Sequence, residues 1–131
     1  MDAIVRTDLV DRFAPVIAAH RGGPFLQGEM LDALTLHREG NLTIAWAPFD
    51  HVPANARLVI VGITPGRQQA ENALSAFQKA LAQGASSAEA SRRAKLTGAF
   101  SGPMRENLVA MMDRIGVPRV LRLRSAAEMF D

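Results

Sequence analysis

Apolar residues recur at the spacing of amphipathic helices in five parts of the chain. The predicted helices cover about residues 8–19, 30–36, 67–83, 87–96 and 103–115. Two of them carry clear end signals. Ser86 and Glu89 have the spacing of a capping box at the start of the fourth helix, and Gly116 stands where a helix C-terminus favours glycine.

Two other stretches have the patterns of β-strands. Leu42, Ile44 and Trp46 alternate with other residues, as in a half-buried strand, and Trp46 is expected in the core. Residues 58–63 form a nearly unbroken apolar run, typical of a strand buried on both faces of a parallel sheet. Residues 120–123 are a candidate third strand.

A turn with the sequence GITPG follows the apolar run and leads into a helix. Ligands of open α/β sheets bind at this end of a strand. We therefore expect a single α/β domain over residues 1–131, a three-layer α/β/α sandwich with a small, mainly parallel central sheet. Residues 120–123 are one candidate for the parallel neighbour; otherwise the sheet would be completed by residues after 131 or by a partner chain.

The composition narrows the functional classes. The chain has 131 residues and no cysteine, which excludes disulfides, thiolate nucleophiles and cysteine-ligated metals. His20, His37 and His51 lie 17 and 14 residues apart, so their spacing predicts no metal site, and no cofactor is expected. No apolar run approaches the length of a membrane span, and the acidic N-terminus lacks the pattern of a signal peptide, so the expected location is the cytoplasm.

Basic residues concentrate in one part of the chain. Residues 92–124 hold eight Lys and Arg against two acidic residues, a local net charge of +6 in a chain of net charge +2. This suits a phosphate-backbone partner, although a solvated helix face explains the pattern as well. The GITPGR turn lacks the Gly-Lys-Ser/Thr ending of a nucleotide P-loop. Chemistry alone favours a structural strand-to-helix turn over an anion site formed by backbone amides.

Two segments together resemble the uracil-DNA glycosylase superfamily. VGITPG, followed by Arg67 and a helix, is similar to the GxNPG motif of its mismatch-specific and single-strand-selective branches. The later GAFSGPMRENLVAMMDRIGV resembles a companion segment of the mismatch-specific branch. The two occur in the expected order and cover about residues 57–117.

The resemblance implies hydrolysis of the N-glycosidic bond of a uracil-like base flipped out of single-stranded or duplex DNA. It places Thr64 at the catalytic position and Phe100 as the stacking surface, although a phenylalanine before a helix also commonly packs in the core. The implied base-binding residues are Gly62, Ile63, Pro65, Gly66, Phe100 and Asn107. The expected phosphate contacts are Arg67, Arg92, Arg93, Lys95 and Arg105.

Two departures from the family pattern stand out. Thr64 occupies the place of the asparagine that holds the attacking water, and no histidine follows the matched region. The expectation is a weak or inactive glycosylase, either the N-terminal part of a longer domain or a derivative that has lost the chemistry. The alternative is a non-catalytic nucleic-acid or nucleotide binding module. A third is a homo-oligomer formed through an exposed sheet edge and Met104, Met111 and Met112.

Overall fold

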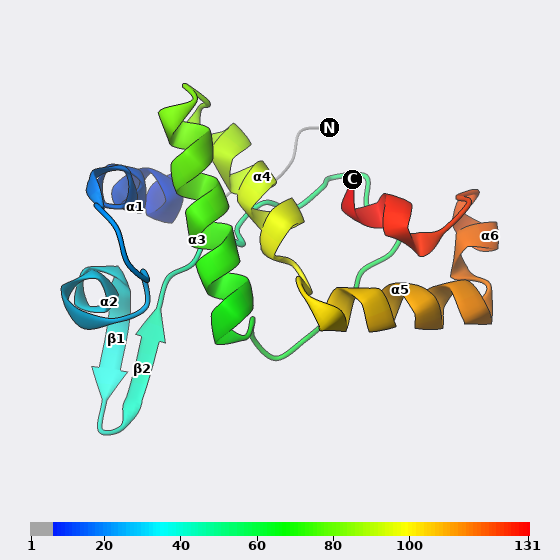
Figure 1. Ribbon diagram of the computed structural model, residues 1–131, viewed down its shortest axis with the longest axis horizontal. Coiled ribbons are helices and arrows are strands. Elements are labelled where there is room, and N and C mark those ends of the chain that lie inside the picture. The colour runs from blue at the N-terminus through cyan, green and yellow to red at the C-terminus, as the bar shows by residue number, and fades with distance from the viewer. Residues whose placement is uncertain (1–6) are drawn as a thin grey trace.

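The computed structural model describes residues 7–131, so Asp2 of the acidic N-terminus lies outside it. The described chain folds into six α-helices, one β-hairpin and a final 3-10 helix. In order these are α1 (Thr7–Ala19), α2 (Gly28–Leu34), β1 (Thr35–Glu39), β2 (Leu42–Ala45), α3 (Arg67–Ala82), α4 (Ser87–Gly98), α5 (Pro103–Ile115), α6 (Val117–Leu121) and η1 (Ala126–Phe130). Helices α3 and α4 lie side by side at the centre, with α1, α2 and the hairpin on one side and α5, α6 and η1 on the other (Figure 1).

The predicted three-layer sandwich with a parallel sheet is wrong. Within residues 7–131 the only sheet is the antiparallel hairpin, in which Thr35 pairs with Ala45 and Glu39 with Leu42. The expected strand at 120–123 is wrong, because its first two residues belong to α6, whose first turn Pro118 suits, and the other two form no strand. A parallel sheet requires neighbouring strands, and the described chain provides none beside residues 58–63.

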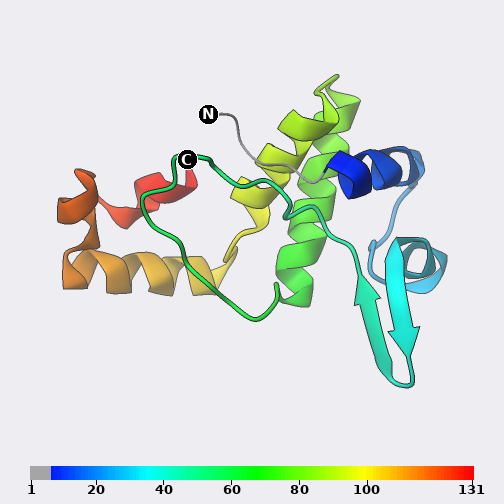
Figure 2. The same cartoon turned by 180° about the vertical axis from the view of Figure 1, so that it is seen from behind.

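Residues 58–63 form no strand and are not buried, which overturns the expected buried strand. Val61 and Ile63 are exposed over essentially their whole surface, Val61 to 87% and Ile63 fully. The segment belongs to a long connection from β2 to α3 that crosses behind the molecule toward the C-terminal helices and returns (Figure 2). Arg57 fastens it there, since its guanidinium donates to the backbone carbonyls of Val120 and Leu121 at 3.1 and 3.0 Å.

The hydrophobic core lies where α1, α3 and α4 meet the end of the hairpin. Trp46 is buried there as expected, stacked on Phe13 at 5.0 Å between ring centroids and edge-on to Phe77 at 5.9 Å. Its indole Nε1 donates to Asp50 Oδ2 at 3.0 Å, which satisfies the polar atom of a buried ring. Alanines on α3 and α4 allow these two helices to approach closely.

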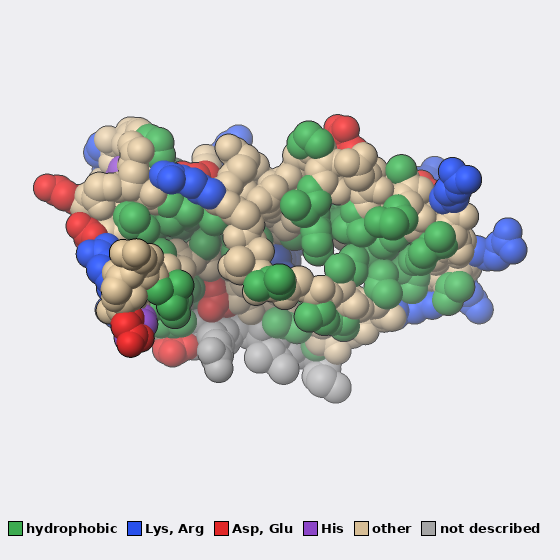
Figure 3. Space-filling model, turned by 90° about the horizontal axis from the view of Figure 1, so that it is seen from below, with side chains coloured by type: hydrophobic (Ala, Val, Ile, Leu, Met, Phe, Trp, Pro, Cys, Tyr) green, Lys and Arg blue, Asp and Glu red, His purple; other side chains and the backbone are tan. Residues whose placement is uncertain are grey.

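The local end signals of the helices are confirmed. Ser86 Oγ accepts the Glu89 backbone N–H at 3.2 Å, and Gly116 ends α5 with a left-handed φ of 86°. The expected apolar face of α5 is mostly uncovered, because Met112 is buried while Met111 and Ile115 are exposed. Hydrophobic side chains accordingly gather over the half of the molecule that holds α5 and α6 (Figure 3).

Candidate functional site

A pocket of about 260 Å³ lies between the turn before α3, the end of α4 and the start of α5. One wall is the turn itself, residues 62–66, and the opposite wall includes Phe100 and Met104. Phe49, Gln69 and Lys95 complete most of the lining. The structure therefore brings together seven of the residues singled out from the sequence: Gly62, Ile63, Thr64, Pro65, Gly66, Lys95 and Phe100.

Phe100 has an unusual backbone conformation, with a left-handed φ of 54°. A bulky residue in this region carries a conformational cost of about 1–3 kcal/mol, and such residues cluster at functional sites. The adjacent Ser101 is held by helix α3 in two places. Gln69 Nε2 donates to the Ser101 carbonyl at 2.9 Å, and Asn72 Nδ2 donates to Ser101 Oγ at 3.0 Å. These bonds fix the turn that carries the Phe100 ring to the pocket.

Arg105 supports the same turn from its other side. Its guanidinium donates to the carbonyls of Leu96, Thr97 and Ala99, with distances from 2.6 to 3.1 Å, and so caps the end of α4. It also lies 4.6 Å from the ring centroid of Phe130. Burial lowers the pKa of this side chain, which nevertheless remains charged at neutral pH. Arg105 thus uses its donors inside the protein, although the sequence suggested a phosphate contact.

Lys95 lies in the pocket wall, where its Nζ donates to the backbone carbonyl of His51. Burial lowers the pKa of this half-buried amine, and the nearby Asp50 opposes the effect. The pKa of His51 is also lowered, first by burial and then by the charges of Lys95 and Arg92. The His51 imidazole is therefore mostly neutral at pH 7, and none of the three histidines lines the pocket.

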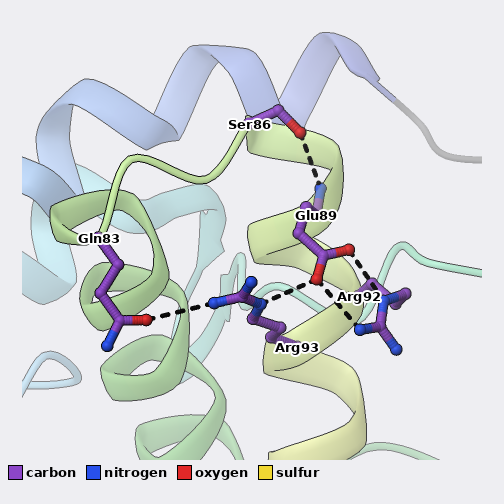
Figure 4. Close-up of polar contacts among 5 residues, drawn as sticks. All are labelled: Gln83, Ser86, Glu89, Arg92 and Arg93. Carbon is purple, nitrogen blue, oxygen red and sulfur yellow. Dashed lines mark hydrogen bonds and ion pairs between the residues drawn. The ribbon is translucent and has the colours of Figure 1, made fainter.

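Arg92 and Arg93 lie on the surface of α4 and share one carboxylate (Figure 4). Glu89 accepts from Arg92 Nε at 2.9 Å and from Arg93 Nε at 2.8 Å. Arg93 also donates to the side-chain carbonyl of Gln83 at 3.2 Å. Both guanidinium groups remain partly exposed, so each retains a surface available to solvent while its position is fixed.

The two remaining candidates lie outside the pocket. Arg67 begins α3 and donates to the Leu26 carbonyl at 2.8 Å. Asn107 is exposed on α5 and does not line the pocket. Sequence reasoning in turn missed Phe49, Gln69 and Met104. Gln69 lies in the first turn of α3, three residues after Gly66, a spacing that places it beside the turn, whereas nothing local marks Phe49 because it reaches the pocket through the long connection.

The described residues add two negative findings. Residues 7–131 contain no group of three or more His, Asp or Glu side chains placed to hold a metal ion. Every helix in the same range is too short or too polar to cross a membrane.

Comparison with known proteins gives one relative. The chain is 36% identical over 102 residues to a Bacillus subtilis (strain 168) protein described as "Uncharacterized protein YoxB". The match covers 77% of this chain and 40% of that protein, so the matched part spans less than half of its relative's length. The relative's description states no activity. No protein-family model matches the sequence, and no solved structure is significantly similar.

Proposed function

We propose that the pocket binds a uracil-like base flipped out of DNA and slowly hydrolyses its N-glycosidic bond. The observation that carries this proposal is the meeting of the 62–66 turn and Phe100 around one cavity. These are the two segments through which the sequence resembles the uracil-DNA glycosylase superfamily. They are separated by the whole of α3 and α4, so their meeting does not follow from closeness in sequence.

The size and lining of the pocket support a single base as the ligand. Its volume of about 260 Å³ lies just below the range of about 300–1,000 Å³ typical of pockets for drug-sized molecules. Phe49 and Phe100 offer aromatic surfaces for stacking, which a flipped base requires. The Thr64 hydroxyl and the backbone groups of the turn offer hydrogen bonds to the base edge.

The expected rate is low because of the residue at position 64. Bond cleavage produces an oxocarbenium-like sugar and an anionic base, so a well-placed water and donors to the growing charge lower the barrier. Thr64 presents a hydroxyl on a short β-branched stem where the family pattern has an amide that holds the water. No imidazole lines the pocket to donate to the leaving base.

The test is incubation of excess protein with uracil-containing single- and double-stranded oligonucleotides, followed by detection of abasic sites. Thr64→Asn is expected to raise the rate at least tenfold. Thr97→Asn is the matched control, since Thr97 is an exposed threonine of α4 outside the pocket. Phe100→Gly is expected to abolish product while the fold survives, because glycine favours the left-handed backbone at this position. Absence of abasic product from both wild type and Thr64→Asn would exclude the activity.

A non-catalytic binding module is the second candidate, and the threonine at position 64 together with the lack of a pocket imidazole favours it. Fluorescence anisotropy measures the binding of a labelled oligonucleotide at increasing salt and, together with the abasic-site assay, distinguishes the glycosylase from the binding module. Binding that weakens steeply with salt, without turnover, supports the module. No binding at low salt excludes both functions.

A further inference from the structure

Lys95 is a candidate nucleophile that the proposed reaction does not use. The chain has only two lysines, Lys79 and Lys95. Lys79 is exposed on α3, away from the pocket, whereas Lys95 lies in the pocket wall with Phe49 and Phe100. The hydrogen bond from its Nζ to the His51 carbonyl fixes the position of the amine. One of the two lysines therefore lies at the ligand cavity, with its amine held beside the backbone of the connection before α3.

The environment of Lys95 suits amine chemistry. Burial lowers the pKa of this side chain and so raises the fraction of neutral amine at neutral pH. A neutral, partly desolvated lysine adds to carbonyl compounds, and this is the usual way in which proteins form imines. The apolar rings of Phe49 and Phe100 border the same pocket.

We propose that Lys95 forms an imine with an aldehyde bound in the pocket, namely the ring-opened sugar of an abasic site in DNA. This inference rests on the proposed function, because removal of a base leaves a sugar whose ring-opened form carries an aldehyde at C1′. The nitrogen lone pair attacks the carbonyl carbon and a C=N bond forms. The carbonyl oxygen leaves as water with two protons, so the step needs no oxidant or reductant, and water reverses it.

A purely structural role for Lys95 makes a different prediction. In that case the lysine only ties the connection around His51 to α4, and an arginine replaces it adequately because it keeps the charge and the donors. Arginine does not form the imine, since its guanidinium stays protonated. Lys95→Arg therefore separates covalent chemistry from tethering.

The experiment traps the imine with sodium borohydride, which reduces it to a stable secondary amine. The full chain is incubated with an oligonucleotide that carries a preformed abasic site, and the covalent product is measured by denaturing gel and located by peptide mass spectrometry. We expect an adduct on Lys95 in the wild type, an unchanged yield in the Lys79→Arg control, and a loss of at least tenfold in Lys95→Arg. Circular dichroism checks that both variants remain folded.

Two results would overturn the proposal. One is an adduct that persists in folded Lys95→Arg or maps to Lys79 or to the α-amino group. The other is the absence of any adduct in the wild type at saturating abasic DNA. Because the abasic site is preformed, the trapping does not depend on base excision. Excision without trapping overturns only the role of Lys95, and trapping without excision leaves that role intact while the glycosylase activity fails.

Discussion

Gly98→Ala is the sharpest test of the packing that positions the pocket. Gly98 is the buried last residue of α4, where it faces α3. A Cβ atom added there would lie 2.7 Å from the Ala73 Cβ, 2.9 Å from the Gln69 carbonyl oxygen and 3.1 Å from the Phe49 ring, whereas ordinary contacts are 3.4–4 Å. Two of these neighbours, Gln69 and Phe49, line the pocket.

The expected effect is a net loss of stability. Overpacking of a tight site typically costs about 1–3 kcal/mol, and a close backbone oxygen cannot rotate away as a side chain can. Helix propensity favours alanine over glycine by about 1 kcal/mol in a helix interior and by less at a helix end. We expect the free energy of unfolding to fall by about 1–2 kcal/mol, which lowers the urea midpoint by about 0.5–1 M for an m-value of about 2 kcal/mol/M.

The assay is urea unfolding followed by the fluorescence of Trp46, the single and buried tryptophan. Gly62→Ala is the matched control, because Gly62 has no left-handed φ and no atom lies within 4 Å of the added carbon. The control is expected to change stability by no more than about 0.5 kcal/mol. If Gly98→Ala equals or exceeds the wild type in stability, α3 and α4 do not pack as closely as described.

Three further predictions test other parts of the structure. Val61→Ser and Ile63→Ser should each change the free energy of unfolding by less than about 0.5 kcal/mol in urea titrations, because both side chains are exposed; losses of about 2 kcal/mol or more would indicate burial after all. Glu71→Ala should destabilise the protein by about 1.5–3 kcal/mol, because the Glu71 carboxylate accepts the backbone N–H groups of Phe25 and Leu26, at 2.9 and 2.7 Å. The same substitution should speed hydrogen exchange at these two amides, and unchanged exchange would refute this role of Glu71. Hydrogen bonds from Arg92 and Arg93 lower the pKa of Glu89 from 4.5 to about 2. The stabilisation by this carboxylate is therefore complete above about pH 4.5 and is lost as the pH falls through about 2. An NMR titration of Glu89 with a midpoint near 4.5 would contradict the ion pairs.

Two motifs in the sequence predicted which segments line the pocket. The 62–66 turn and Phe100 were singled out by their resemblance to two motifs, and the structure places them around one cavity. Charge alone was a poorer guide to side-chain roles. Arg105 and Lys95 belong to the same basic region, yet one caps α4 and the other lines the pocket. Which carbonyl or cavity a long side chain reaches depends on neighbours that are distant in sequence.

The hairpin was only half anticipated. The alternation around Leu42 and Ile44 predicted β2, but Thr35–Glu39 was missed. The predicted helix over 30–36 wrongly included the first two residues of this strand, whose residues are mostly exposed and carry no apolar alternation. Thr35–Glu39 is a strand because its backbone is hydrogen-bonded to β2. The side chains of Thr35–Glu39 have no pattern that would predict a strand.

The sequence by itself determined where the five longest α-helices of the described chain lie, because capping residues, glycine at a left-handed position and a 3.6-residue period act within a few residues of one another. Ser86 with Glu89 and the helix-ending Gly116 are such local signals. Only the tertiary structure decided whether residues 58–63 form a buried strand or an exposed connection. An unbroken apolar run is compatible with a buried strand or an exposed connection, and the choice depends on whether neighbouring strands exist to pair with its backbone, which no local pattern records.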